Sequence, residues 1–153
     1  MEAVQLRQVF DDLVRFETVL WNSVDARLRQ ECSLPLGSLN VMMAIASTPS
    51  CRVYDIANAL AITVGGTSQA VDRIEALGYC ARRPNPADRR SSILELTEAG
   101  EELLATAGAV FDRELESLLR APLSESELGH LGTALATARA AAVARAKAPG
   151  AAD

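Results

Sequence analysis

The sequence predicts a mainly α-helical protein of the α+β class, with six helices and one two-stranded β-hairpin. Hydrophobic residues make up 49% of the 153 residues but aromatic residues only 4%, a composition typical of an alanine- and leucine-rich helical core. Apolar residues recur at steps of three and four over most of the chain, as they do on one face of a helix. Residues 80–96 differ, because two strand-like runs there flank a turn that contains Pro84, Asn85 and Pro86.

The first two helices are expected upstream of this segment. Residues 3–31 are predicted to form one long amphipathic helix, in which charged residues separate the apolar positions. A second helix is expected over about residues 37–47, and the cluster at residues 48–50, Thr-Pro-Ser, would end it.

The next two helices are short and are joined by a tight turn. The third contains Val53 and Leu60, and the fourth is expected to begin at the N-cap Thr63, to run to Leu77 and to stop at Gly78. Two short helices joined in this way give the pattern of a helix-turn-helix.

The hairpin that follows carries a focused positive charge. Its strands are expected near residues 80–84 and 91–96, and residues 82–90 hold four arginines and one aspartate in a chain with a formal charge of −5. A helix-turn-helix followed by an arginine-tipped hairpin is a winged helix, whose usual partner is double-stranded DNA. The acidic remainder of the chain would limit non-specific binding. The alternative for the hairpin tip alone is a solvated basic turn.

Two further helices are expected over residues 98–147. Thr97 is the predicted N-cap of the fifth helix, which reaches about Arg120, and Ser124 with Glu127 forms a capping box for the sixth. The terminal helices are long and apolar-striped, so they either form the core of a monomer or pair across a two-fold axis. We favour the homodimer because it buries the stripes better.

Residues 1–153 would then form a single domain. Its DNA-binding lobe is the winged helix at about residues 37–96, and its dimerisation helices are at about residues 3–31 and 98–147.

The fourth helix is the predicted recognition helix. We expect Ile62, Val71, Ile74 and Leu77 to face the core. The opposite face would then present small and polar residues suited to the major groove, namely Thr63, Gly65, Gly66, Thr67, Ser68, Gln69 and Arg73.

Individual roles on this face follow from side-chain chemistry. Gln69 can pair bidentately with adenine, and Ser68 or Thr67 can contact a base or a phosphate. Two consecutive glycines in a helix cost about 1 kcal/mol each relative to alanine, which indicates that DNA approaches the backbone there, unless this is simply a loose first turn. Arg73 is expected on a phosphate, although Asp72 and Glu75 offer it intrahelical ion pairs.

The wing supplies a second set of candidate DNA contacts. Asp88 and Arg90 are two residues apart, so both can point the same way, and Asp88 is expected to hold an arginine by a charge-assisted hydrogen bond. An arginine held in this way can enter a narrow minor groove. Arg89, with Arg82 and Arg83 on the strands, would contact phosphates.

Four runs of sequence carry a family resemblance, at residues 56–60, 71–79, 86–90 and 96–100. They read IANAL, VDRIEALGY, PADRR and LTEAG. In these runs the chain resembles the MarR family of bacterial winged-helix regulators, and the six-helix layout extends the resemblance over nearly the whole chain. The resemblance implies a homodimeric repressor that binds an imperfect palindromic operator. Many members release DNA when a small, often aromatic or anionic, effector binds between the DNA lobe and the dimerisation helices.

The chain departs from the family pattern at two places. Arg52 and Tyr54 stand near the start of the third helix, where a small polar residue is common, and each would either contact the DNA backbone or pack. Gly65 and Gly66 replace bulkier polar residues, so the operator preference of relatives does not carry over. For the effector pocket the candidates are Arg15, Trp21, Asn22 and Asp25, with core or dimer packing as the alternative for Trp21.

Other kinds of chemistry find little support. Cys32, Cys51 and Cys80 have no metal-binding spacing and His130 stands alone, so neither a metal site nor a cofactor is expected, and oxidant sensing by a cysteine stays open. An odd cysteine count and the lack of a signal or spanning segment indicate a cytoplasmic protein without a membrane partner. There is no nucleophile elbow or phosphate-binding loop, so an enzyme is not expected. The alternative function is a helical protein- or ligand-binding module that retains the fold without operator binding.

Overall fold

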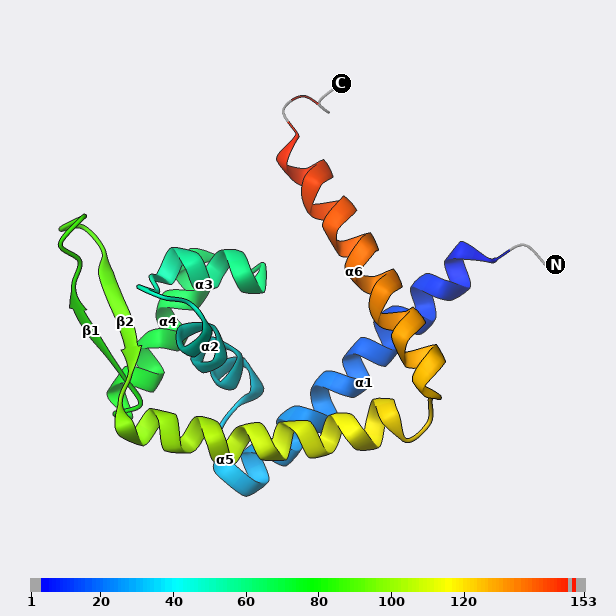
Figure 1. Ribbon diagram of the computed structural model, residues 1–153, viewed down its shortest axis with the longest axis horizontal. Coiled ribbons are helices and arrows are strands. Elements are labelled where there is room, and N and C mark those ends of the chain that lie inside the picture. The colour runs from blue at the N-terminus through cyan, green and yellow to red at the C-terminus, as the bar shows by residue number, and fades with distance from the viewer. Residues whose placement is uncertain (1–3, 149, 151–153) are drawn as a thin grey trace. The chain divides into compact units, whose positions relative to one another are not determined.

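The computed structural model describes residues 4–148 and 150 (Figure 1). Residue 3 of the first predicted helix therefore lies outside the described residues. Within them the chain forms six α-helices, one π-helical segment and one antiparallel strand pair, which confirms the predicted mainly α-helical class with a β-hairpin. In chain order these are α1 Leu6–Cys32, α2 Leu36–Ser47, α3 Val53–Leu60, α4 Val64–Ala76, β1 Cys80–Pro84, β2 Ser92–Leu96, α5 Glu98–Leu115, η1 Glu116–Arg120 and α6 Glu125–Lys147.

The contacts divide the chain into two compact units, one that ends at Glu114 and one that begins at Leu115. In the first unit α2 is the central helix, in contact with α1, α3, α4 and β2. Leu39 and Met42 are fully buried on it. Its first turn is held by Asp25 of α1, whose Oδ1 accepts a hydrogen bond from the amide of Leu36 at 2.8 Å. A short apolar helix thus forms the core on which the helix-turn-helix is built.

Both ends of α4 follow the predicted capping residues. Thr63 Oγ1 accepts a hydrogen bond from the amide of Gly66 at 3.0 Å and so caps the N-terminus. Gly78 adopts a φ of +83°, and the amide of Tyr79 donates to the carbonyl of Ile74 at 2.9 Å. This left-handed turn satisfies the last carbonyls of the helix and directs the chain into β1.

The hairpin is attached to the core at its base. β1 and β2 pair antiparallel with Cys80 opposite Leu96 and Pro84 opposite Ser92, in close agreement with the predicted strands. Ile93 and Leu94 are buried, and the amide of Leu94 donates to the carbonyl of Cys51 at 2.7 Å. The far end of the hairpin projects away from α2, α3 and α4 (Figure 1).

The junction between β2 and α5 requires glycine at residue 100. A Cβ built on Gly100 would lie 1.9 Å from the carbonyl oxygen of Tyr79. Thr97 Oγ1 donates to the carbonyl of Gly78 at 2.6 Å and accepts from the amide of Gly100 at 3.1 Å, so Thr97 both caps α5 and ties it to the turn after α4. The predicted N-cap is confirmed.

The second unit contains η1 and α6. The fifth helix was expected to reach about Arg120, but the α-helical bonding of α5 ends at Leu115 and the turn Glu116–Arg120 is π-helical, with the amide of Ala121 bonded to the carbonyl of Glu116 at 2.9 Å. Ser124 and Glu127 form the predicted capping box at the start of α6. None of the residues Glu125–Lys147 is buried in the single chain. In the part of the chain that the structure describes, no helix has the length and apolar character needed to span a bilayer.

Candidate nucleic-acid interface

The buried face of α4 differs from the predicted one. Val71 and Ile74 are buried as expected, but Ile62 is 46% exposed and Leu77 is 65% exposed. Ile62 precedes the N-cap and Leu77 is the C-cap, so neither lies within the helical repeat. The stripe that packs on the core is instead Thr67, Ala70, Val71 and Ile74.

Thr67 was predicted to face DNA, and this prediction is wrong. Its side chain is 0% exposed, and its hydroxyl donates to the carbonyl of Thr63 at 2.8 Å. Apolar residues three and four positions further on place Thr67 on the core side of the helix. A threonine can occupy that position because its hydroxyl is satisfied by the backbone one turn earlier.

Most of the remaining recognition-helix candidates lie on the surface. Thr63, Gly65, Gly66, Gln69 and Arg73 are exposed and Ser68 is half-buried. Nothing lies within 4 Å of a Cβ built on Gly65, whereas one on Gly66 would lie 3.0 Å from Thr63 Oγ1. Packing within the chain therefore does not explain glycine at residue 65, and both glycines belong to a capped helix rather than to a loose turn.

Asparagine and aspartate side chains order the wing tip. Asn85 Oδ1 accepts from the amide of Ala87 at 3.0 Å, and Asn85 Nδ2 donates to Ser91 Oγ at 3.0 Å. Asp88 Oδ1 accepts from the backbone amide of Arg90 at 2.9 Å. Asp88 was expected to bond an arginine side chain, but its carboxylate caps the turn instead. Arg89 and Arg90 are both exposed, and among the described residues neither of them forms an ion pair.

The arginines on β1 are paired with carboxylates. Arg82 donates to Asp72 Oδ1 at 2.7 Å and to Glu75 Oε1 at 2.8 Å, and Arg83 donates to Glu95 Oε1 at 2.6 Å. These partners of Arg82 were not expected from the sequence, in which Asp72 and Glu75 are near neighbours of Arg73 and lie seven to ten residues before Arg82. In the part of the chain that is described Arg73 forms no ion pair, so its intrahelical alternative is not adopted.

Near the start of α3, Arg52 is held by Asp55. The Arg52 amide donates to Asp55 Oδ2 at 2.9 Å, and its guanidinium contacts the same carboxylate at 3.3 Å. The hydrogen bond from Arg52 lowers the pKa of Asp55, despite the opposing effect of burial. Tyr54 is exposed. Arg52 and Arg83 both line a surface cavity of about 620 Å³ that lies between the start of α3 and the wing.

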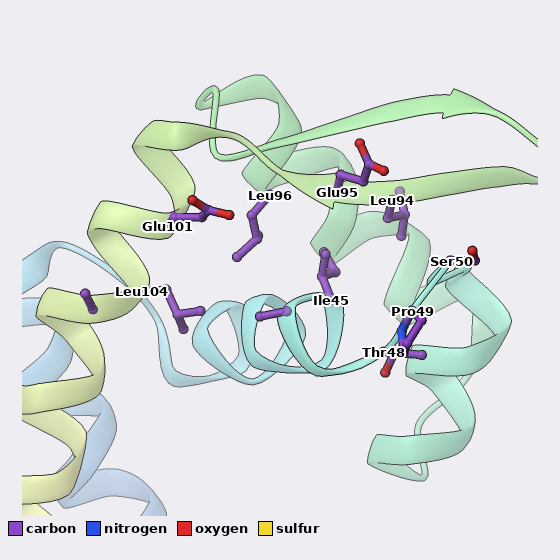
Figure 2. A pocket seen from close by; sticks show the side chains of 11 residues that line it. Ile45, Thr48, Pro49, Ser50, Leu94, Glu95, Leu96, Glu101 and Leu104 are labelled. Carbon is purple, nitrogen blue, oxygen red and sulfur yellow. The ribbon is translucent and has the colours of Figure 1, made fainter.

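A second cavity shares Thr48, Pro49 and Ser50 with the first. It has a volume of about 660 Å³ and is bounded by the end of α2, by β2 and by α5 (Figure 2). Ile45, Leu96 and Leu104 supply apolar surface, and Glu95 and Glu101 supply carboxylates. No lining residue is basic.

The four effector-pocket candidates on α1 do not line this cavity. Asp25 is bonded to the amide of Leu36 and to Arg29. Burial raises the pKa of Asp25, but these hydrogen bonds outweigh it, so the pKa is lowered overall. Arg15 is paired with Asp11, while Trp21 is 42% exposed and Asn22 is exposed. Asp25 therefore has a structural contact at the α1–α2 junction.

The cysteines differ in accessibility. Cys51 and Cys80 are buried, and Cys32 is half-buried. Burial, followed by the charge of Glu75, raises the pKa of Cys80 to about 11, and burial with the charge of Asp55 raises that of Cys51. Both thiols are therefore disfavoured as thiolates and as oxidant sensors. Among the described residues, no three histidine, cysteine or acidic side chains cluster as metal ligands would.

The arrangement of α3, α4 and the basic hairpin defines a winged helix-turn-helix protein. Residues 33–91 match the model of the MarR family. The chain is 29% identical over 106 residues to the HTH-type transcriptional regulator BilQ of Clostridium symbiosum, with 69% of this chain and 73% of that protein aligned. It is 24% identical over 114 residues to the multiple antibiotic resistance protein MarR of Escherichia coli, with 72% and 79% aligned.

A solved structure agrees with this assignment at the level of the fold. Sco3205, a MarR family transcriptional regulator from Streptomyces coelicolor crystallised in complex with DNA, superposes with a TM-score of 0.82 at 22% identity, covering 100% of this chain and 95% of that one. This chain belongs to the MarR family of DNA-binding transcriptional regulators, as the four sequence runs predicted. The family is non-enzymatic, in agreement with the sequence analysis.

Proposed function

We propose that the chain is a homodimeric repressor that binds a palindromic operator and is released from it by a small-molecule effector. The DNA part is supported by two exposed surfaces, namely the polar N-terminal half of α4 and the wing-tip arginines, which form no ion pair among the described residues. Gln69 and Ser68 would read bases in the major groove, and Arg89 and Arg90 would bind the backbone or the minor groove.

Selection from random duplex DNA, with wild type and Arg90→Ala in parallel, tests this part. We expect the wild type to enrich a two-fold symmetric sequence and the variant to bind that sequence more weakly. Enrichment of nothing by a folded wild type, with and without candidate effectors, would contradict operator binding and favour a binding module that kept the fold.

The dimer is supported by the exposed apolar residues of α1. Leu6, Phe10 and Leu13 follow one another at steps of four and three residues, so they lie on one face, and Phe10 is 68% exposed in the single chain. Exposed apolar residues along one face of a helix in the single chain indicate an interface. Its proposed occupant is a second copy of this chain, because a palindromic operator requires two-fold symmetry.

Sedimentation of Phe10→Asp against Gln30→Asp tests the dimer. Both variants introduce the same charge on α1, but Gln30 lies outside the apolar stripe. We expect only Phe10→Asp to shift the protein toward the monomer. Equal dimerisation of the two variants would rule out this face as the interface.

The effector site that the cavities support best is the one between α2, β2 and α5. A ligand there would contact both the DNA-binding lobe, through β2, and α5. The lining contains Glu95 and Glu101 but no basic side chain, so we expect a neutral or cationic amphipathic ligand rather than an anion. The test is DNA release by a small panel of aromatic cations and aromatic carboxylates.

A matched pair of variants checks the location of this site. Ala105 lines the cavity and Ala109 lies one turn further along α5, outside it, and both are exposed. Ala105→Trp should abolish the response to an active compound without abolishing DNA binding, whereas Ala109→Trp should respond as wild type. A normal response of Ala105→Trp would place the effector elsewhere, for example near Trp21.

A further inference from the structure

Arg82 forms a side-chain link between the wing and the recognition helix. Its Nη2 donates to Asp72 Oδ1 at 2.7 Å and its Nη1 to Glu75 Oε1 at 2.8 Å. Asp72 and Glu75 are three residues apart on α4, so they form neighbouring acceptors on one face of the helix. One planar guanidinium therefore holds two carboxylates of the helix that is proposed to read the major groove.

Arg82 lies just beyond the point where β1 leaves the core, so its bonds to α4 restrain the projecting part of the hairpin. Cys80 is the only buried residue of the five in β1, so the strand leaves the core immediately after it. Arg82 follows two residues later, on the same side of the strand as Cys80. Beyond that point the described hydrogen bonds of β1 go to β2, apart from the two from Arg82 to α4.

The positive charge of the Arg82 guanidinium is already paired with two carboxylates. The Arg82 side chain is 31% exposed, against 63% for Asp72 and 36% for Glu75. The hydrogen bond that Arg82 donates to Asp72 is the main reason that the pKa of Arg82 is raised. A DNA phosphate that took this guanidinium would have to compete with two carboxylates already in contact with it.

We propose that Arg82 is a positioning residue, which fixes the wing against the recognition helix so that both enter the DNA as one rigid unit. This assignment replaces the phosphate contact predicted from the sequence, and it rests on the proposed DNA-binding surface. Holding the two elements in their bound arrangement lowers the entropy cost of binding, so the link contributes to affinity without touching DNA.

The dependence of DNA affinity on salt distinguishes positioning from phosphate contact. Log affinity falls linearly with log salt concentration. Loss of one phosphate contact reduces the steepness of this fall by about 0.9, because one fewer counterion is released. We expect Arg82→Gln to weaken operator binding about three- to tenfold with an unchanged slope. Arg90→Gln, measured beside it, should lower the slope. A lowered slope for Arg82→Gln would overturn the proposal.

Removal of a carboxylate gives a test of opposite sign. Asp72→Ala removes one of the two carboxylates of α4 that pair with Arg82. We expect this substitution to weaken operator binding because it loosens the link. If Arg82 instead served a phosphate, the same substitution would strengthen binding, because it removes a carboxylate near DNA.

A double-substitution cycle keeps the result independent of any general loss of fold. Arg82→Gln combined with Asp72→Ala should bind no more weakly than Arg82→Gln alone, since the link is already broken. Thermal unfolding of every variant identifies those that fail to fold, and Asp72→Ala stands in for Arg82→Gln if that variant is one of them. Additive effects in folded variants would reject the link. Failure of the wild type to bind any duplex would reject the proposed function instead.

Discussion

Two pairs of arginines lie on the wing, and their surroundings differ. Arg82 and Arg83, on β1, meet carboxylates of α4 and β2 at 2.6 to 2.8 Å. Arg89 and Arg90, in the tip, are exposed, and the nearby Asp88 uses its carboxylate on a backbone amide. The protein holds the side chains of the first pair, whereas the bonds described for the second pair reach only the backbone amide of Arg90.

This difference changes how the charge of the wing is counted. The four arginines of residues 82–90 stand close to four carboxylates once Asp72, Glu75 and Glu95 are included with Asp88. The wing is therefore not a uniformly basic surface, and the positive potential is concentrated at its tip. A narrow charged tip beside a polar helix face favours one docking arrangement over general attraction to polyanions.

The largest effect on DNA binding is expected at the tip. Arg90→Ala should cost about 1–3 kcal/mol of operator affinity and lower the salt slope by about 0.9, because an exposed guanidinium with no partner among the described residues is lost. Arg83→Ala removes the same side chain from a paired position and should change affinity less. Fluorescence anisotropy over a salt series measures both, and equal losses in the two variants would break the comparison.

At the base of the wing the expected effect is on folding. Gly100→Ala places a Cβ where Tyr79 O lies 1.9 Å away, so the turn after α4 or the start of α5 must move. Overpacking of this kind costs about 1–3 kcal/mol, which chemical denaturation would detect as a lower midpoint. Gly108→Ala, on the same helix with open space at its Cβ, is the control and should not destabilise. A Gly100→Ala protein as stable as wild type would contradict the close contact.

A smaller effect is expected from the aspartate in the tip. Asp88→Ala removes the acceptor of the Arg90 amide and also removes a negative charge beside the proposed DNA surface. If order in the tip matters more than charge, Asp88→Ala lowers the affinity for the operator several-fold. The loss of one turn hydrogen bond corresponds to roughly 1 kcal/mol. Asp88→Asn retains an acceptor and loses the charge, so it should bind at least as well as wild type. Tighter binding by Asp88→Ala would show that charge dominates.

The smallest change is predicted on the recognition helix. Gly65→Ala meets nothing within 4 Å inside the chain, so it should raise stability by up to about 1 kcal/mol through helix propensity. If DNA approaches the backbone there, the same methyl group should weaken operator binding. Thermal unfolding and DNA titration of one sample report both. Higher stability with unchanged affinity would mean that the glycine serves no contact with DNA.

Local signals in the sequence were sufficient to predict the elements and most of their ends. Thr63, Gly78, Thr97 and Ser124 act at helix ends through bonds to residues within a few positions, so their roles can be read without knowing the fold. The turn residues of the wing act over similarly short distances, as the Asn85 and Asp88 hydrogen bonds show.

Which polar side chains are buried, exposed or paired depended on tertiary packing. Thr67 faces the core one turn before Ala70 and Val71, where the Thr63 carbonyl accepts its hydroxyl hydrogen bond, and its polar side chain alone did not indicate this burial. Arg82 meets Asp72 and Glu75, ten and seven residues earlier, only because the turn at Gly78 brings β1 back along α4. A charge is free or paired according to which partners the fold places within about 3 Å of it, and sequence composition counts charges without that information.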